Sequence, residues 1–480
     1  MQLLATAKHW PGMGLSPRLT GRASARAHHS PLASAFLRRV EPFFAGSEVT
    51  GGPLLIATIL ALVLTNIGTA HAYERFWDMP VRIAFGDRAV SHRLAEWIDH
   101  ALLPLFFVIV GADVKRELVD GALSQWRSAA FPLAGAIGGM AVPIGLYLLV
   151  AGGGAAQPGW GTVITTDTAF GLALIALFAT SLPVGLRALM LAFAAVDDVG
   201  GLLVIAFAYS DAIDPIGLIV AGAALAGIVG LRRIGWVSSV PYVLLALIVW
   251  GGVLESGIHA TIAGVLIGLT VPVAPRLAQA AFAERVQRRV DEFKHAHGAA
   301  ERAEDDEEEH QQRERAEERL GYLQEMASAT RVASSRLIEV LTPWVNYVVL
   351  PLFALSNVRI HLSGDLLAMV ASPLVIGVVL GLVVGKPLGF LGFTWAASAI
   401  GLARRPDRVT WRMVTGVGAL AGIGFTISLF IAGLAFGDGE MREAASLGVL
   451  IASILAAAIG YAILRSCTGP RPMAGAPPEP

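Results

Sequence analysis

The chain has 480 residues, of which 55% are hydrophobic and 15% are charged, and its formal net charge is −1. Soluble domains carry roughly 25% charged residues, so this composition, with a mean hydropathy of +0.63, indicates a membrane protein. A net charge near zero gives no general attraction to nucleic acid, and we expect no nucleic-acid partner. The single cysteine, Cys467, excludes a disulfide within the chain.

The first 46 residues are a separate region. Residues 1–46 lack the long apolar core of a secretory signal and are rich in arginine and poor in acids. Although this composition superficially resembles a transit peptide, we interpret the segment as a basic cytoplasmic tail. Its basic residues are Lys8, Arg18, Arg22, Arg26, Arg38 and Arg39.

About twelve apolar segments follow, each near the 20 or so residues that a helix needs to cross a bilayer. The sequence therefore predicts an all-α polytopic membrane protein held in the lipid bilayer. Its first membrane half covers residues 47–274 (spans 1–8), and its second membrane part covers 337–466 (spans 9–12). The predicted spans are 52–70, 94–114, 129–151, 161–180, 185–208, 215–230, 237–254, 257–273, 337–358, 372–400, 414–436 and 445–464.

Basic residues predict the orientation, because cytoplasmic loops carry an excess of Lys and Arg. The loops after spans 3, 5 and 7 contain neither residue, although the loop after span 1 opposes the trend with four arginines. The balance places both termini in the cytoplasm. The basic residues that follow spans 2, 6 and 10 are Lys115, Arg116, Arg127, Arg232, Arg233, Arg404, Arg405 and Arg408.

The loop after span 1 predicts a short β-hairpin from Val81 to His92. Val81, Ile83 and Phe85 alternate with Arg82 and Ala84 before Gly86–Asp87, a pair that suits a two-residue turn. The hairpin either orders this outer loop or pairs with the hairpin of a second copy in a homodimer.

Two charged or proline-rich regions complete the domain organisation. Residues 275–336 include an unbroken acidic run at 304–309, which indicates a charged cytoplasmic insertion. We interpret this insertion as a solvated linker in preference to a regulatory arm. Residues 467–480 are a Pro-rich tail.

Asp197 and Asp198 lie together in span 5, between uncharged runs at 188–196 and 199–208. A charged side chain at bilayer depth costs roughly 2.5–3.5 kcal/mol on insertion scales, and such residues usually mark functional sites. Two adjacent carboxylates also repel each other, so one of them is expected to hold a proton. The pair is either a protonated, hydrogen-bonded structural feature or, as we favour, a cation and proton site in a transporter.

Two further charges lie inside predicted spans. Asp167 is surrounded by Thr165, Thr166 and Thr168 in span 4, and Lys386 lies deep in span 10. A buried ammonium needs a carboxylate partner, and the residues leave Asp197 and Asp167 as the candidates. A polar cluster such as the one around Asp167 is expected where a membrane helix breaks and its half-helix ends face a binding site.

Span 11 carries four glycines, at positions 416, 418, 422 and 424. This density favours either close helix packing or an unwound segment. Spans 4 and 11 occupy corresponding places in the two halves of the chain, which indicates inverted repeats with two broken helices.

The polar residues suggest a cation site without a cofactor. Na⁺ and Li⁺ are hard cations that prefer oxygen ligands, by the logic that applies to Ca²⁺ and Mg²⁺. Asp198 and Asp167 would supply carboxylates and Thr166 a further oxygen. Such a carboxylate binds either a proton or the cation, and this competition is what an antiporter needs.

Seven short stretches together resemble the NhaA-type bacterial sodium/proton antiporters. They lie at 111–118, 166–170, 195–198, 257–264, 350–354, 385–389 and 422–426. The resemblance implies a multi-pass transporter of the bacterial plasma (inner) membrane, not an enzyme. It implies exchange of cytoplasmic Na⁺ or Li⁺ for external H⁺, electrogenic and regulated by pH, with spans 4 and 11 broken and crossed.

The resemblance also implies roles for individual residues. Asp198 would be the main cation ligand and proton carrier, and Asp197 its neighbour, paired with Lys386. Asp167 would compensate the facing half-helix ends, with Thr166 beside the site.

Two more residues match the family's pH-response positions. Asp113 stands where the family carries a Glu in the cytoplasmic funnel, and His259 matches a histidine linked to pH response. The chain departs from the pattern at Asp99–His100, where the family has Asn-Asp, and the charged insertion is longer than usual.

Two classes of alternative remain open at the sequence level. A related carrier, such as a potassium/proton exchanger or a sodium-coupled symporter, would use the same residue types. An intramembrane aspartyl protease also needs two membrane aspartates, but on different helices, whereas Asp197 and Asp198 are adjacent.

Overall fold

The apolar segments are helices in the computed structural model, which describes residues 51–85, 88–178, 181–210, 213–236, 238–273, 333–362 and 366–468. The expected tail at 1–46, most of the insertion at 275–336 and most of the tail at 467–480 lie outside these residues. The longer helices are α2 (Gly52–Asn66), α5 (Leu103–Val119), α6 (Trp126–Ala151), α8 (Val184–Ala208), α9 (Pro215–Arg233), α10 (Val240–Glu255), α11 (Ala260–Thr270), α14 (Ala333–Trp344), α18 (Lys386–Ala399), α19 (Trp411–Ala421), α20 (Phe425–Phe436) and α21 (Glu440–Cys467). The shorter ones are α3 (Ala70–Trp77), α4 (Leu94–Trp97), α7 (Thr168–Ala176), α15 (Leu350–Asn357), α16 (Leu366–Val370) and α17 (Pro373–Leu380).

The membrane-spanning character of the predicted segments is borne out. In the described part of the chain, seven continuous helical segments are long and apolar enough to cross a membrane, and nine if two bent pairs each count as one span. The other predicted spans correspond to α10, to α11, and to α7 with the 3₁₀ segment η4 (Gly154–Val163) before it. These elements are shorter than a full crossing.

Three of the long spans contain a π-helical turn immediately before a proline-containing segment. These turns are η2 (Ile98–Leu102), η5 (Val345–Val349) and η6 (Gly381–Gly385), and the prolines that follow them are Pro104, Pro351 and Pro387. Proline has no N–H and its ring displaces the carbonyl four residues earlier, so a wider turn accommodates it. The π-helical turn η6 ends immediately before Lys386, whose ammonium is buried.

Two spans are broken, and their breaks meet. The chain is non-helical from Ile164 to Asp167, between η4 and α7, and again at 422–424, where α19 and α20 meet at an angle of 42°. The Asp167 N–H donates to the Ile423 carbonyl at 2.5 Å, so the unwound segments satisfy each other's backbone. The expectation of two broken spans that cross is therefore confirmed.

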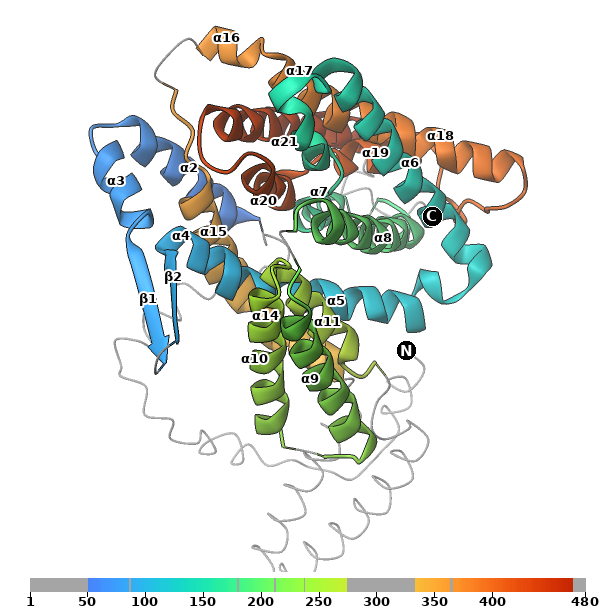
Figure 1. The fold of residues 1–480 in the computed structure, drawn as a ribbon. Coiled ribbons are helices and arrows are strands. Elements are labelled where there is room, and N and C mark those ends of the chain that lie inside the picture. Colours follow the sequence, from blue (N-terminus) through green and yellow to red (C-terminus); the bar gives the residue numbers. More distant parts are fainter. Residues whose placement is uncertain are drawn as a thin grey trace, which may run out of the picture. The chain divides into compact units, whose positions relative to one another are not determined.

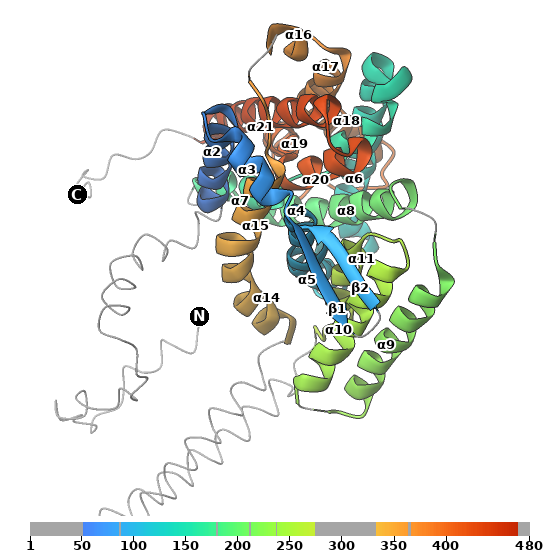
Figure 2. The same ribbon diagram turned by 60° about the vertical axis from the view of Figure 1, so that its left-hand side comes forward.

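The helices that carry the charged residues pack around these breaks. α6 lies against α8 and α18, and α21 lies against α17, α19 and α20. The α6–α18 crossing depends on Gly138 and Gly389, because a Cβ on either would overlap the carbonyl oxygen of the other. α9 and α10 run side by side and pack with α11 around a second, smaller apolar cluster (Figure 1 and Figure 2).

The predicted hairpin is present. Strand β1 (Pro80–Phe85) pairs antiparallel with β2 (Arg88–Arg93), with Phe85 opposite Arg88 in the register. This register requires a two-residue connection, and the expected Gly86–Asp87 turn itself lies outside the described residues. Among the described residues the sheet has two strands, so no other described strand pairs with the outer edge of either.

Candidate functional site

The adjacent aspartates are buried near the middle of α8. Asp197 is 0% exposed and Asp198 is 8% exposed, and the helix around them is otherwise apolar for several turns on both sides. Successive residues point about 100° apart on a helix, so the two carboxylates face different neighbours. The two side chains therefore differ in what they contact.

Asp197 forms an ion pair with Lys386, which is also 0% exposed. Lys386 Nζ donates to both carboxylate oxygens, at 2.8 and 2.7 Å, and to Thr166 Oγ1 at 3.1 Å. An ammonium has three donors, and three oxygens accept them here. The ring of Phe193 lies 5.6 Å from the ammonium. The expected pairing of these two residues is present in the structure.

Asp198 differs because its Oδ1 is buried without a hydrogen-bond partner among the described residues. The carboxylates of Asp197, Asp167 and Asp113 disfavour a negative charge on Asp198, and the ammonium of Lys386 favours it. Buried polar atoms are nearly always paired, so an unpaired carboxylate oxygen needs an explanation. A proton or a cation bound at Asp198 would supply the missing partner.

Asp167 joins the first turns of two half-helices. Its Oδ1 accepts from the Phe170 N–H of α7 at 3.4 Å. Its Oδ2 accepts from the N–H and the hydroxyl of Thr426, in α20, at 3.3 and 2.7 Å. Helix N-termini carry partial positive charge, so this carboxylate lies where two such ends converge.

The opposite helix end is connected to the lysine. Thr166 Oγ1 donates to the Ala421 carbonyl, at the C-terminus of α19, at 2.8 Å, and accepts from Lys386. The partial negative charge of that helix end is therefore linked to the ammonium through one hydroxyl. At the breaks, a carboxylate therefore lies at the N-termini of the half-helices α7 and α20. An ammonium is linked to the C-terminus of the half-helix α19.

Both carboxylate and hydroxyl oxygens surround the Lys386 ammonium beside Asp198. Among the described residues no group of three or more His, Cys, Asp or Glu side chains is arranged to hold a metal ion. Carboxylate and hydroxyl oxygens are ligand types that hard cations prefer. Thr166 lies beside the pair and is already engaged by Lys386.

The two pH-response candidates lie away from the ion pair. Asp113, on α5, pairs with Arg116 at 2.9 Å and is partly exposed. His259 precedes α11, stacks on His100 with ring centroids 5.2 Å apart, and meets the edge of Phe430 at 4.9 Å. Neither residue has a direct hydrogen bond to the ion pair in the described contacts. Asp113 reaches Asp198 only through its charge.

Sequence reasoning missed two polar partners. Thr426 supplies Asp167 with its shortest hydrogen bond, and a hydroxyl directly after a glycine-rich break was the available signal. Asn357, at the end of α15, donates to Asp99 Oδ1 at 2.9 Å. No sequence pattern singled out Asn357, because its charged partners, Asp99 and Arg442, are 258 and 85 residues away.

Buried charges between two broken, crossed spans of a polytopic helical protein define an integral membrane transporter. Comparison with known proteins specifies the class. A family model described as Na+/H+ antiporter 1 matches residues 41–464. The chain belongs to this family of antiporters, which are transporters rather than enzymes.

Curated relatives cover nearly the whole chain. Na(+)/H(+) antiporter NhaA 2 of Sorangium cellulosum is 38% identical over 439 residues, which is 90% of this chain and 91% of that protein. NhaA of Bordetella petrii is 38% identical over 91% of this chain and 94% of its own length, and NhaA of Koribacter versatilis is 36% identical over 95% and 97%. Among solved structures, the sodium proton antiporter MjNhaP1 of Methanocaldococcus jannaschii aligns with a TM-score of 0.42 and 13% identity over 91% of this chain and 94% of that one.

Proposed function

We propose that this protein exchanges cytoplasmic Na⁺ or Li⁺ for external protons across the bacterial plasma (inner) membrane, electrogenically and under control of pH. The observation that carries the proposal is the buried, unpartnered oxygen of Asp198 next to the Asp197–Lys386 ion pair. The relatives that span this chain are named as Na⁺/H⁺ antiporters, in agreement with that chemistry.

In the proton-loaded state, Asp198 holds a proton and Lys386 is a charged ammonium paired with Asp197. A Na⁺ that arrives at Asp198 displaces its proton and attracts Asp197 and Thr166. The attraction weakens the hold of these two residues on Lys386. The ammonium then releases its proton, so two protons leave as one cation binds. The site changes from net charge zero to −1, counting Na⁺, Asp197, Asp198 and Lys386.

Asp167 and Thr166 supply further oxygens to this cation site. Asp167 is held by the first turns of α7 and α20, so its carboxylate can approach a cation without leaving the helix ends uncompensated. Asp113 and His259 are the proposed pH-response residues, because both carry titratable groups and lie outside the ion pair. Both termini are proposed to be cytoplasmic, from the distribution of basic loops.

The β1–β2 hairpin is proposed to form a homodimer contact. Neither outer edge pairs with another strand in the part of the chain that the structure describes, and the Ile83 side chain is 56% exposed. A second hairpin would extend the sheet by pairing at an edge.

A gradient experiment tests the proposed exchange and separates it from the alternatives. Purified protein is reconstituted in vesicles that contain a pH dye, and inward or outward gradients of Na⁺, Li⁺ or K⁺ are imposed in turn. Proton movement opposite to Na⁺ and Li⁺, and absent with K⁺, is expected. Exchange driven by K⁺ alone, or proton movement in the same direction as Na⁺, would favour a potassium exchanger or a symporter instead.

A further inference from the structure

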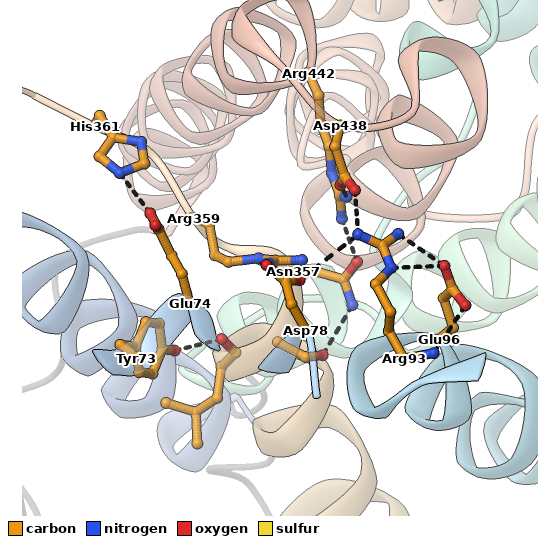
Figure 3. Close-up of polar contacts among 12 residues, drawn as sticks. Tyr73, Glu74, Asp78, Arg93, Glu96, Asn357, Arg359, His361, Asp438 and Arg442 are labelled. Atoms are coloured by element: carbon orange, nitrogen blue, oxygen red, sulfur yellow. Dashed lines mark hydrogen bonds and ion pairs between the residues drawn. The ribbon is translucent and has the colours of Figure 1, made fainter. Parts of the chain in front are cut away.

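A cluster of charged and polar side chains lies where four parts of the chain meet (Figure 3). They are α3 with the residue after it, the end of β2 with α4, the end of α15 with the segment after it, and the α20–α21 turn with the start of α21. We call it the charged loop cluster; its members are Glu74, Asp78, Arg93, Glu96, Asn357, Arg359, His361, Asp438, Arg442 and Glu443. None of these residues belongs to the cation site described above.

Three links in the cluster join α21 and its preceding turn to the rest. Arg93 Nη1 donates to Asp438 Oδ2. Arg442 Nη2 donates to Asn357 Oδ1 at 2.6 Å. Glu443 accepts from the backbone N–H of His361 at 2.9 Å and lies 3.0 Å from His361 Nδ1.

Other bonds brace each side of this contact. On one side, Arg359 pairs with Asp78 at 2.8 Å, and His361 Nε2 lies 2.7 Å from Glu74 Oε1. On the other side, Arg442 pairs with Asp438 at 2.6 Å. Asp438 lies between Gly437 and Gly439, whose φ values of 62° and 135° fix a turn that other residues rarely adopt. The crossing links therefore connect two internally braced bodies.

Helix α20 connects the cation site to the charged loop cluster. α20 begins at the break that holds Asp167 and ends at the turn that holds Asp438. It packs on α15, where the rings of Phe430 and Phe353 lie 6.4 Å apart and both are buried. A separation of α20 from α15 would break the aromatic contact, and a separation of the α20–α21 turn from the segment after α15 would break the crossing links.

From this arrangement we infer that the charged loop cluster is a gate, which holds this face closed while the site opens to the other face. The inference rests on the proposed exchange function, and the proposed orientation makes this face external. Arg93, Asn357 and His361 lie on the stationary side, and Asp438, Arg442 and Glu443 lie on the side that moves with α20 and α21.

His361 makes the gate sensitive to pH. Glu74 of α3 and Glu443 of α21 face its two ring nitrogens, Arg359 lies two residues before it, and Glu440 lines the same cavity of about 860 Å³. Burial opposes the charged imidazole, but the hydrogen bonds and attraction of Glu443 and Glu74 outweigh it and raise the pKa of His361. Because the folded pKa is the higher one, the bridge is complete below about pH 6.5, the ordinary value, and is lost as pH rises through the raised pKa.

Reversible cross-linking tests the gate. Cys467 is first replaced by serine, because it is the single cysteine of the chain, and Arg93→Cys is combined with Asp438→Cys. A short bifunctional methanethiosulfonate reagent links the pair across the gate. We expect Na⁺-driven proton exchange in vesicles to fall at least tenfold and to return after reduction with dithiothreitol.

A matched pair controls for the chemistry. Arg404→Cys with Asp407→Cys links two residues of one surface loop outside the cluster, which lie 3.8 Å apart in the native protein, and should keep its exchange rate when cross-linked. Full exchange by the cross-linked Arg93→Cys/Asp438→Cys protein would overturn the gate. Absence of exchange in the uncross-linked parent would instead refute the proposed function.

A second readout does not depend on ion exchange. Ser356 is fully buried beneath the cluster, so Ser356→Cys in detergent reports opening through its rate of labelling by a maleimide, normalised to the exposed Arg404→Cys. Asp438→Asn should raise this rate at least threefold, and Asp214→Asn, on the distant α9, should not. The normalised labelling rate of Ser356→Cys should also rise between pH 6 and 8.5. In a variant that also carries His361→Gln, this rise should be absent. If Asp438→Asn does not change the labelling rate of Ser356→Cys, the gate proposal is wrong. This conclusion holds even if the protein shows no ion exchange.

Discussion

Removing Lys386 should destabilise the protein strongly, and removing Asp197 as well should restore much of the loss. Both side chains are 0% exposed, so solvent does not screen the remaining charge when one partner is deleted. Lys386→Gln removes an ammonium that donates to three oxygens and leaves Asp197 without its counter-ion. Breaking a buried ion pair in this way costs about 3–5 kcal/mol.

The double variant distinguishes pairing from mere burial. In Asp197→Asn with Lys386→Gln neither charge is left alone, and the two amides and the Thr166 hydroxyl can still form hydrogen bonds. We expect its free energy of unfolding to lie closer to that of the parent than to that of Lys386→Gln. Thermal unfolding in detergent of the parent, both single variants and the double variant completes the cycle.

Additive losses in this cycle would refute the reasoning. They would mean that Lys386 is stabilised by a group other than Asp197, and the release of its proton when a cation binds would lose its structural basis. A control pair at the surface, Arg404 and Asp407, is nearly fully exposed, and its atoms lie 3.8 Å apart. Its removal should change stability by less than about 1 kcal/mol.

Four further outcomes follow from the geometry. Asp198→Asn should leave the protein folded but abolish cation-driven proton release, whereas Asp214→Asn should keep the parent rate; exchange at the parent rate in Asp198→Asn would refute the assignment. With two protons exchanged per Na⁺, a clamped potential of 100 mV should contribute about 2.3 kcal/mol per cycle, and transport indifferent to a valinomycin clamp would exclude that stoichiometry. Thr426→Val removes a 2.7 Å hydrogen bond to Asp167 and should cost about 1–3 kcal/mol in thermal unfolding, more than Thr65→Val, whose hydroxyl bonds only its own helix. Finally, the stability lost in His361→Gln should be greatest below about pH 6.5 and should vanish as pH rises through the raised pKa of His361; a loss that does not change with pH would contradict the charged bridge.

Much of the membrane architecture could be predicted from the sequence because its causes are local. A run of about 20 apolar residues is a span whatever surrounds it, so the bounds of α6, α8 and α21 follow closely from composition. The same reasoning exposed Asp197, Asp198 and Lys386, because each is costly at its own position in a span. The hairpin was also visible, since alternation and a turn pair are properties of a dozen neighbouring residues.

The tertiary structure determined which residues that are distant in the sequence contact one another. The residues alone left Asp197 and Asp167 as candidate partners for Lys386. In the folded protein Lys386 pairs with Asp197, which is 189 positions away in the sequence. Asp167 is taken instead by the first turns of α7 and α20, and Asp198 is left with an unpaired oxygen. The charged loop cluster had no signature, since Arg93 and Asp438 are 345 residues apart. Insertion into a membrane depends on each segment's own composition, whereas a contact between segments depends on how all the helices pack, and a single sequence does not state that packing.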